Sequence, residues 1–79
     1  MTKTAEMVMS LFQTHDKVQT GTVLTSSEVS RGSQNWEPSD FAELEGAIRE
    51  LSYEGLVIIT VSKGLELTEK GLAFLLNEQ

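Results

Sequence analysis

The side chains best suited to chemistry in this sequence of 79 residues are its carboxylates and a single histidine, His15. A nucleophile or general base needs a partner group that touches and orients it. Asp16 follows His15 directly, but neighbours on a helix point about 100° apart, so the two do not form a dyad. We therefore expect His15 to be a structural residue and the protein not to be an enzyme.

Metal and cofactor sites are not expected either. The chain contains no cysteine, which excludes a disulfide scaffold and zinc sites with sulfur ligands. Its twelve Asp and Glu residues lack the spacing of a calcium-binding loop. Its six glycines are scattered and do not form a phosphate-binding run.

The charge balance disfavours nucleic acid and membranes as partners. Six Lys and Arg residues against twelve Asp and Glu residues give a net charge of −6, whereas DNA and anionic lipids attract cationic surfaces. The longest apolar runs, residues 56–59 and 72–76, are far shorter than the ~20 residues that span a bilayer. Without an export signal at the start or any cysteine, the sequence favours a cytoplasmic protein.

Helices must position these carboxylates, and the first part of the chain predicts one helix and one strand. Apolar residues at helical spacing predict a helix over residues 5–18, capped by Thr4. Its apolar arc is wide because Met7 and Met9 extend it, which is typical of a helix between two layers or beside a partner. A short strand is expected at residues 22–24.

Two further helices are expected in the middle of the chain. Thr25 and Glu28 have the spacing of a capping box, and the short helix that they open should end near Gly32. Pro38 suits the first turn of the next helix, and Gly55 suits its end. This third helix carries an apolar seam at intervals of three, four and three residues: Phe41, Leu44, Ile48 and Leu51.

The last third of the chain predicts a β-hairpin followed by a helix. Residues 56–61 have the composition of a strand, and residues 65–67 alternate between apolar and polar side chains. Residues 62–64 form the turn between them. Thr68 then caps a final helix that includes the apolar run 72–76.

Two segments of this pattern resemble a known family. Residues 49–57 (RELSYEGLV) are similar to the segment in which bacterial winged-helix regulators leave their third helix and enter the wing. Residues 67–71 (LTEKG) resemble the segment in which many of them leave the wing. The resemblance spans about residues 5–76 and implies one winged-helix domain over residues 1–79. The loop 32–37 is longer than the usual three or four residues.

The fold that this resemblance implies is α+β and mainly α. It consists of a three-helix helix-turn-helix core, a β-wing of two or three strands and a short C-terminal helix. In winged-helix regulators the third helix enters the major groove. The same fold also serves RNA binding and protein contact, so fold alone does not decide function.

The third helix is the candidate functional element. If its apolar seam turns inward, the opposite side faces outward, and we expect that side to contact a partner: Ala42, Glu43, Gly46, Glu50 and Tyr53. Residues 36–55 carry six carboxylates and one arginine, a balance that repels DNA. Nucleic-acid contacts, if any, would come from four cations: Arg31, Arg49, Lys63 and Lys70.

The last helix is apolar on all sides, so part of it should be exposed in a monomer. Exposed apolar patches often mark interfaces, and winged-helix regulators frequently dimerise through helices outside the motif. The expected dimer contacts are Met7, Met9, Phe74, Leu75 and Leu76. Alternatively, the two patches pack on each other within one chain.

Together these features favour a non-enzymatic winged-helix regulatory module of the transcription-regulator type. We expect it to act through protein contact or self-association, as a homodimer, rather than by strong direct DNA binding. One alternative is a DNA-binding transcriptional regulator whose dimer uses the wing lysines. Another is an acidic adaptor, or a DNA-mimic-like inhibitor of a host protein.

Overall fold

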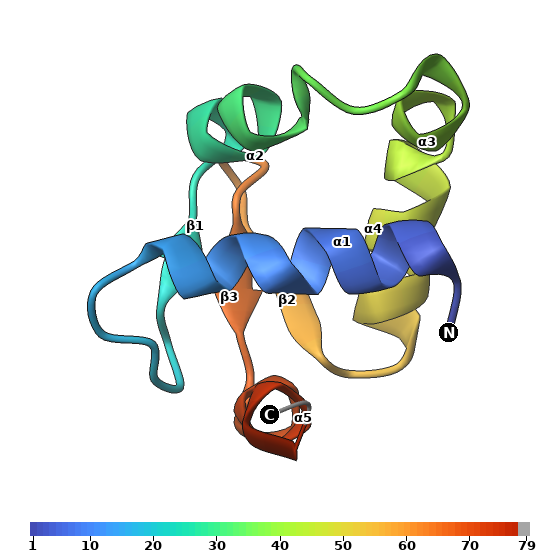
Figure 1. Cartoon of the computed structure of the whole chain (residues 1–79). Helices are drawn as coiled ribbons and strands as arrows, with labels where there is room; N and C mark the ends of the chain where they lie inside the picture. The colour runs from blue at the N-terminus through green and yellow to red at the C-terminus, as the bar shows by residue number, and fades with distance from the viewer. Residues whose placement is uncertain (78–79) are drawn as a thin grey trace.

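The structure, a computed structural model, describes residues 1–77, in which helices surround a small three-stranded antiparallel sheet (Figure 1). The expected α+β, mainly helical class is confirmed. Residues 78 and 79, the end of the expected domain, lie outside the described residues. The elements are α1 (Lys3–Leu11), the 3-10 helix η1 (Phe12–Thr14), β1 (Val23–Leu24), α2 (Ser26–Ser33), α3 (Pro38–Ala42), α4 (Leu44–Tyr53), β2 (Val57–Ile59), β3 (Leu65–Leu67) and α5 (Glu69–Asn77).

The first helix begins earlier and ends sooner than the sequence predicts. Thr2, not Thr4, caps α1, because its hydroxyl accepts a hydrogen bond from the Ala5 N–H at 3.2 Å. The chain tightens into η1 after Leu11, where the Thr14 hydroxyl donates to the Leu11 carbonyl at 2.8 Å. Such side-chain bonds compete with a continuing helix. The expected range of residues 5–18 is therefore wrong at its C-terminal end, and His15 lies in extended backbone after the helices.

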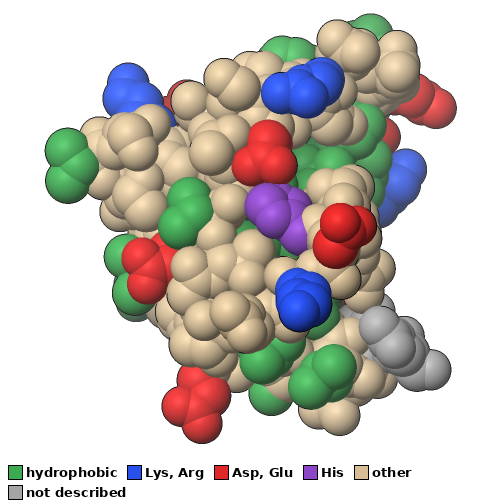
Figure 2. Space-filling view, turned by 90° about the vertical axis from the view of Figure 1, so that its left-hand side faces the viewer, with side chains coloured by type: hydrophobic (Ala, Val, Ile, Leu, Met, Phe, Trp, Pro, Cys, Tyr) green, Lys and Arg blue, Asp and Glu red, His purple; other side chains and the backbone are tan. Residues whose placement is uncertain are grey.

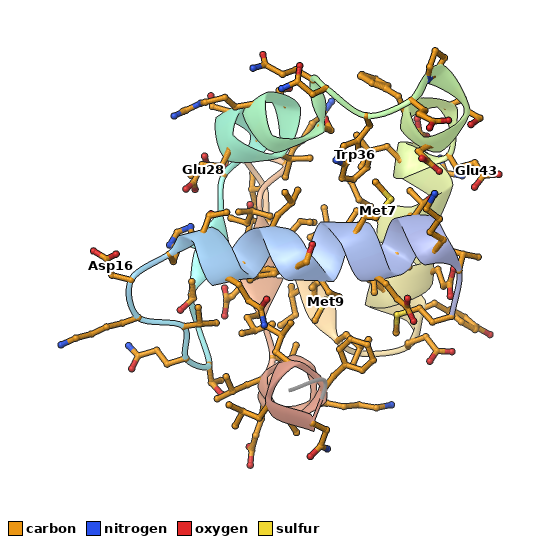
Figure 3. All side chains as sticks on the ribbon, viewed as in Figure 1. Met7, Met9, Asp16, Glu28, Trp36 and Glu43 are labelled. Atoms are coloured by element: carbon orange, nitrogen blue, oxygen red, sulfur yellow. The ribbon has the colours of Figure 1, made fainter. Side chains whose placement is uncertain are left out.

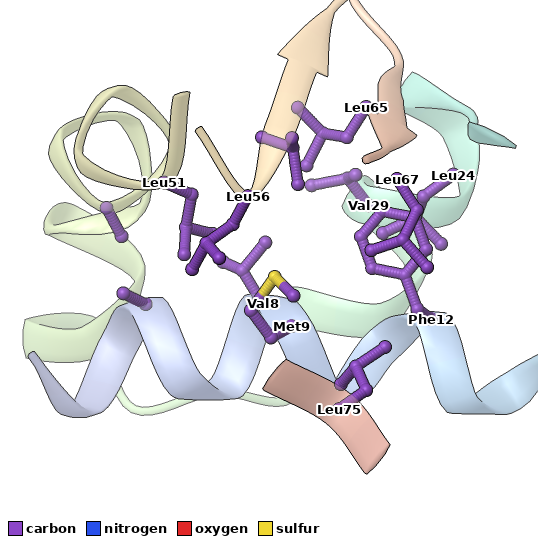
Figure 4. Packing of buried hydrophobic residues seen from close by; sticks show 13 residues of the cluster. Val8, Met9, Phe12, Leu24, Val29, Leu51, Leu56, Leu65, Leu67 and Leu75 are labelled. Atoms are coloured by element: carbon purple, nitrogen blue, oxygen red, sulfur yellow. The ribbon is translucent and has the colours of Figure 1, made fainter. Parts of the chain in front are cut away.

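The core forms where α1 crosses the sheet between α4 and α5 (Figures 1 and 4). Val8, Met9 and Phe12 of α1 are fully buried. They belong to the same cluster as Leu51 of α4 and Leu75 of α5. Burying one such side chain contributes about 1.5–3 kcal/mol, so the wide apolar arc of α1 is used to contact several elements at once.

The sheet has the strand order β1-β3-β2. Val57 pairs with Leu67, Ile58 with Glu66 and Ile59 with Leu65. Since alternate residues of a strand point to opposite faces, Leu65 and Leu67 face the helices and are buried, while Ile58 faces away from them. The expected short strand and hairpin are confirmed, although β2 ends at Ile59 rather than at residue 61.

Local signals position the remaining helices. The capping box of Thr25 and Glu28 is present at the start of α2. The helix continues past Gly32 to Ser33, which leaves residues 34–37 as the connection to α3. This connection is two residues shorter than the predicted loop 32–37, and it bridges α2 and α3, which lie apart (Figure 1).

After the hairpin, the start of α5 lies very close to the backbone that precedes β2. The Thr68 hydroxyl accepts a hydrogen bond from the Gly71 N–H at 3.0 Å, which caps α5 as expected. A side chain at Gly71 would collide with the Leu56 carbonyl oxygen. Glycine at this position therefore lets α5 pack against the chain that enters β2.

Candidate functional site

The expected third helix is two helices that meet at Glu43, where the backbone leaves helical geometry (φ −93°, ψ 0°). The break interrupts the predicted apolar seam. Leu51 is fully buried, but the Phe41 side of α3 turns outward, and Phe41 is 51% exposed. Leu44 and Ile48 are half-buried. The seam is thus correct for Leu51 and wrong for Phe41.

One side of α4 packs against α1, and we call it the α1 flank: Glu43, Ala47, Glu50 and Leu51. Ala47 and Leu51 are buried there. Glu50 accepts hydrogen bonds from the Thr2 N–H at 3.3 Å and from the Thr2 hydroxyl at 3.2 Å. Glu43 accepts from the Thr4 hydroxyl at 3.2 Å, and Figure 3 shows Glu43 beside the start of α1.

These contacts hold the carboxylates of Glu43 and Glu50 beside α1, a role that the sequence did not predict, while Glu43 itself remains exposed. Both carboxylates lie at the N-terminus of α1, where the helix dipole and the unpaired N–H groups attract negative charge. Asp40 adds an ion pair with Lys3, with 3.6 Å between Oδ2 and Nζ. Three of the six carboxylates in residues 36–55 therefore stabilise the start of another helix.

The side of α4 that does face outward carries Glu45, Gly46, Arg49 and Tyr53. Tyr53 is 95% exposed, and no atom lies within 4 Å of where a Gly46 side chain would begin. Arg49 donates to the Glu45 carboxylate at 2.7 Å. Of the five residues of the predicted partner face only Glu50 is half-buried, and four are exposed: Ala42, Glu43, Gly46 and Tyr53. The single arginine of the segment is offset by Glu45.

On its other side α4 borders a hollow of about 470 Å³ between α3, α4 and β2. We call this side the β2 flank; its lining is apolar apart from Glu45 and Arg49, and consists otherwise of Phe41, Ala42, Leu44, Ile48 and Ile59. Ile59 is 45% exposed. The sequence did not predict this surface, because Phe41 belonged to the expected buried seam and Ile59 lies on the same face of the sheet as its buried pairing partner Leu65.

The β2–β3 hairpin, which is the expected wing, and the outer face of the sheet also expose aliphatic side chains, beside Glu66. Val23, Ile58 and Val61 are exposed there. Lys63 occupies the turn between β2 and β3 with a left-handed backbone (φ 66°). Around the wing, exposed aliphatic side chains therefore outnumber cations.

The four candidate nucleic-acid contacts come from four different elements. Arg31 is exposed on α2 and Lys63 is exposed in the wing turn. Arg49 is paired with Glu45. Lys70 of α5 donates to the Glu54 carbonyl at 2.9 Å, at the C-terminal end of α4, where a cation is favourable. Two of the four cations are thus already engaged within the chain.

His15, the purple side chain at the middle of the face in Figure 2, contacts a carboxylate of α2. Its Nε2 lies 2.9 Å from a Glu28 carboxylate oxygen. The backbone N–H of Thr25, which donates to Glu28 at 2.9 Å, lowers the pKa of Glu28, and His15 lowers it further. This contact ties the segment after α1 to the start of α2. Asp16 lies on the loop after the helices, apart from Glu28 (Figure 3).

The predicted dimer surface is wrong for two of its five residues. Met9 and Leu75 are buried in the same core cluster, so these parts of the two patches do pack within one chain. Met7 lies on the opposite side of α1, towards Trp36 (Figure 3), and like Phe74 it is half-buried. Leu76 is 62% exposed beside a groove that Gln13, Val18 and Leu72 also line.

Comparisons of the chain with protein-family models, with curated proteins and with solved structures find no match. Among residues 1–77, no helix combines the length and the apolar character needed to cross a membrane. The same residues contain no group of three or more His, Cys, Asp or Glu side chains that could hold a metal ion.

Proposed function

We propose that the protein is a cytoplasmic, non-enzymatic winged-helix regulatory module that acts through contact with protein rather than through strong direct DNA binding. The winged-helix assignment is supported by the order of α1, β1, α2, α3–α4 and the β2–β3 hairpin. The pairing of β1 with the second strand of the hairpin also fits this fold.

The apolar character of the exposed surface carries the proposal. In a winged-helix regulator the third helix and the wing are the elements that contact DNA. Here these elements expose large apolar side chains: Phe41, Tyr53, Ile58, Ile59 and Val61. Phe41 and Ile59 line one hollow, and exposed apolar groups that lie together are typical of protein interfaces, whereas DNA-contacting surfaces are strongly cationic.

The net charge supports the same function. Glu43 and Glu50 are turned towards α1, but the chain still carries a net charge of −6. Non-specific DNA binding depends on several phosphate contacts from Lys and Arg. On the outward side of α4, Arg49 is the cation, and Glu45 neutralises it.

The test is a fluorescence-anisotropy titration of the full chain with a labelled DNA duplex at low salt. We expect weak binding that Lys63→Ala and the control Lys17→Ala leave equally unchanged. Tight binding that Lys63→Ala abolishes, and that the control retains, would contradict the proposal.

DNA binding by a dimer is the second candidate, and one observation favours it. Because Glu43 and Glu50 face α1, the outward side of α4 is less acidic than the sequence suggests. A two-fold axis could also bring two copies of Lys63 and Arg31 together. Light scattering at high protein concentration tests the dimer, and Leu76→Glu should reduce its mass to that of a monomer if α5 forms the interface.

The acidic-inhibitor alternative has less support. It requires carboxylates that are free to imitate the phosphates of DNA. Those of Asp40, Glu43 and Glu50 are occupied by the first turn of α1. A pull-down with the Glu43→Lys/Glu50→Lys variant tests it, with unchanged capture arguing against an acidic docking face.

A further inference from the structure

The outer edge of β2 offers backbone groups to a partner. Leu67 uses both its N–H and its carbonyl on the β1 side, with bonds of 2.8 Å to Thr22 and Gly21. Successive residues of a strand direct their backbone N–H and carbonyl groups to opposite edges. The N–H and carbonyl of Glu66 therefore point towards β2, where Ile58 lies opposite. On the other strand, the Thr60 N–H donates to the Gly64 carbonyl at 2.9 Å, so the backbone groups of Ile58 and Thr60 both point towards β3.

It follows that Ile59 points its N–H and carbonyl away from β3. Figure 4 shows β2 between α4 and β3, so this outer edge faces α4. Within residues 1–77 no backbone group from another element bonds to Ile59 on that side. Val57 also points outward, but it is only 2% exposed, so access to the edge begins at Ile59.

The hollow of the β2 flank adjoins this edge. The Ile59 side chain forms part of its lining, together with Phe41 and Ile48. Residues paired across neighbouring strands place their side chains on the same face. A residue paired with Ile59 from outside would therefore direct its own side chain into the hollow.

We propose that an extended peptide segment of a partner protein adds to the sheet beside Ile59 and inserts an apolar side chain into this hollow. The inference rests on the proposed function and specifies its partner. An unpaired strand edge is complementary to an extended backbone, which supplies the missing hydrogen bonds, while the hollow selects the side chain.

Charge favours cationic residues at the alternate positions of the peptide. These side chains would lie on the outer face of the sheet, near Ile58, whose pairing partner is Glu66. Lysine can pack its aliphatic stem on an apolar residue and keep its ammonium group in water. The net charge of −6 also steers a cationic segment towards the chain.

The test uses a fluorescein-labelled octapeptide of alternating valine and lysine, titrated with the full chain. We expect saturable binding that weakens as salt is added. The same peptide with N-methyl groups on its valines cannot form the backbone bonds, and should bind roughly tenfold or more weakly. An octapeptide of alternating valine and glutamate should show no binding.

Variants locate the site on the protein. Ile59→Pro removes the outward N–H, a change that an edge strand tolerates, and Ile48→Glu places a charge in the hollow. Both should weaken binding about tenfold or more, whereas Ile58→Thr, on the other face, should leave it within about twofold. Circular dichroism checks that each variant is folded, and Ile48→Glu provides the result if Ile59→Pro does not fold.

Several results would overturn the inference. Equal binding of the N-methylated peptide would exclude strand addition, and so would equal binding by the Ile48→Glu variant. A concentration-dependent dimer that Ile59→Pro dissociates would assign the edge to a second copy of the chain. Absence of peptide binding together with absence of DNA binding would remove this inference and leave the proposed function standing, whereas tight DNA binding removes the proposed function.

Discussion

The two flanks of α4 differ in whether their side chains have partners within the chain. On the α1 flank the carboxylates of Glu43 and Glu50 bond to the first turn of α1, and Leu51 is buried. On the β2 flank Phe41 and Ile59 remain about half exposed beside an open hollow. Glu43 and Glu50 therefore have structural contacts, whereas Phe41 and Ile59 leave apolar surface uncovered. Charge alone is thus a poor guide to which side of an acidic helix meets a partner.

The difference follows from the free energy that helix N–H groups and apolar side chains each gain from a partner. A helix N-terminus leaves four N–H groups without intrahelical partners, and a nearby carboxylate stabilises it by about 0.3–1 kcal/mol. An exposed apolar side chain forgoes roughly 25 cal/mol for each Å² left in water. A partner that covers the β2 flank recovers that free energy, whereas the α1 flank is already satisfied.

We expect the largest loss of stability from a substitution in the buried part of the α1 flank. Leu51→Ala removes a fully buried side chain and should lower the free energy of unfolding by about 2–5 kcal/mol. Phe41→Ala on the β2 flank removes a half-exposed side chain and should cost less than about 1.5 kcal/mol. Urea denaturation of both variants measures the difference, and equal losses would show that the flanks are not distinct.

The carboxylates of the α1 flank should show a smaller effect. Glu50→Ala removes two hydrogen bonds to Thr2 and a charge at the α1 N-terminus, and should cost about 1 kcal/mol. Glu45→Ala removes an exposed ion pair and should cost at most about 0.5 kcal/mol. If the two variants unfold at the same urea concentration, Glu50 is a surface residue like Glu45.

Gly46→Ala tests whether the outward side of α4 is open. No atom lies within 4 Å of the added carbon, so the variant should gain up to about 1 kcal/mol of stability from better helix propensity. Gly71→Ala is the contrasting control, because its side chain would collide with the Leu56 carbonyl and should cost about 1–3 kcal/mol. Thermal unfolding distinguishes them, and a destabilised Gly46→Ala variant would mean that this face is covered.

The smallest predicted effect on stability concerns Glu28, which bonds to a helix start as Glu50 does, but within its own helix. Glu28 caps the start of its own helix, and its pKa is lowered chiefly by the Thr25 N–H. The folded protein therefore holds the ionised form more strongly than the unfolded chain does. Its contribution is complete above the ordinary pKa of glutamate and is lost as pH falls through the lowered pKa.

Thermal unfolding between neutral and acidic pH checks this sign. The wild type should lose stability faster than Glu28→Gln as the pH is lowered, because the variant has no carboxylate to protonate at this position. Parallel curves for the two proteins would contradict the role assigned to Glu28.

Signals that act within a few residues predicted the element order except for η1 and the break between α3 and α4. The capping box at Thr25 and Glu28 needs only the spacing of its two residues. Likewise, Thr68 and Gly71 mark the start of α5 through a bond across three positions. These features could be predicted because their partners are neighbours in the sequence.

The orientation of α4 could not be predicted for two physical reasons. A seam drawn from Phe41 to Leu51 assumes one continuous helix, and a single non-helical residue, Glu43, changes the phase between its halves. The partners of Glu43 and Glu50 are the residues Thr4 and Thr2, which lie 39 and 48 positions away. No local pattern reports such contacts, and for the same reason the sequence left open whether Met9 packs within the chain or against a second copy.

The most direct test is a titration of the ¹⁵N-labelled chain with the alternating valine–lysine octapeptide, followed by amide shifts and amide hydrogen exchange. The account predicts shifts at Phe41, Ile48 and Ile59, with slower exchange of the Ile59 amide, while the amides of Thr2 and Thr4 remain unchanged. Shifts centred on the α1 flank, with the Ile59 amide unaffected, would contradict it.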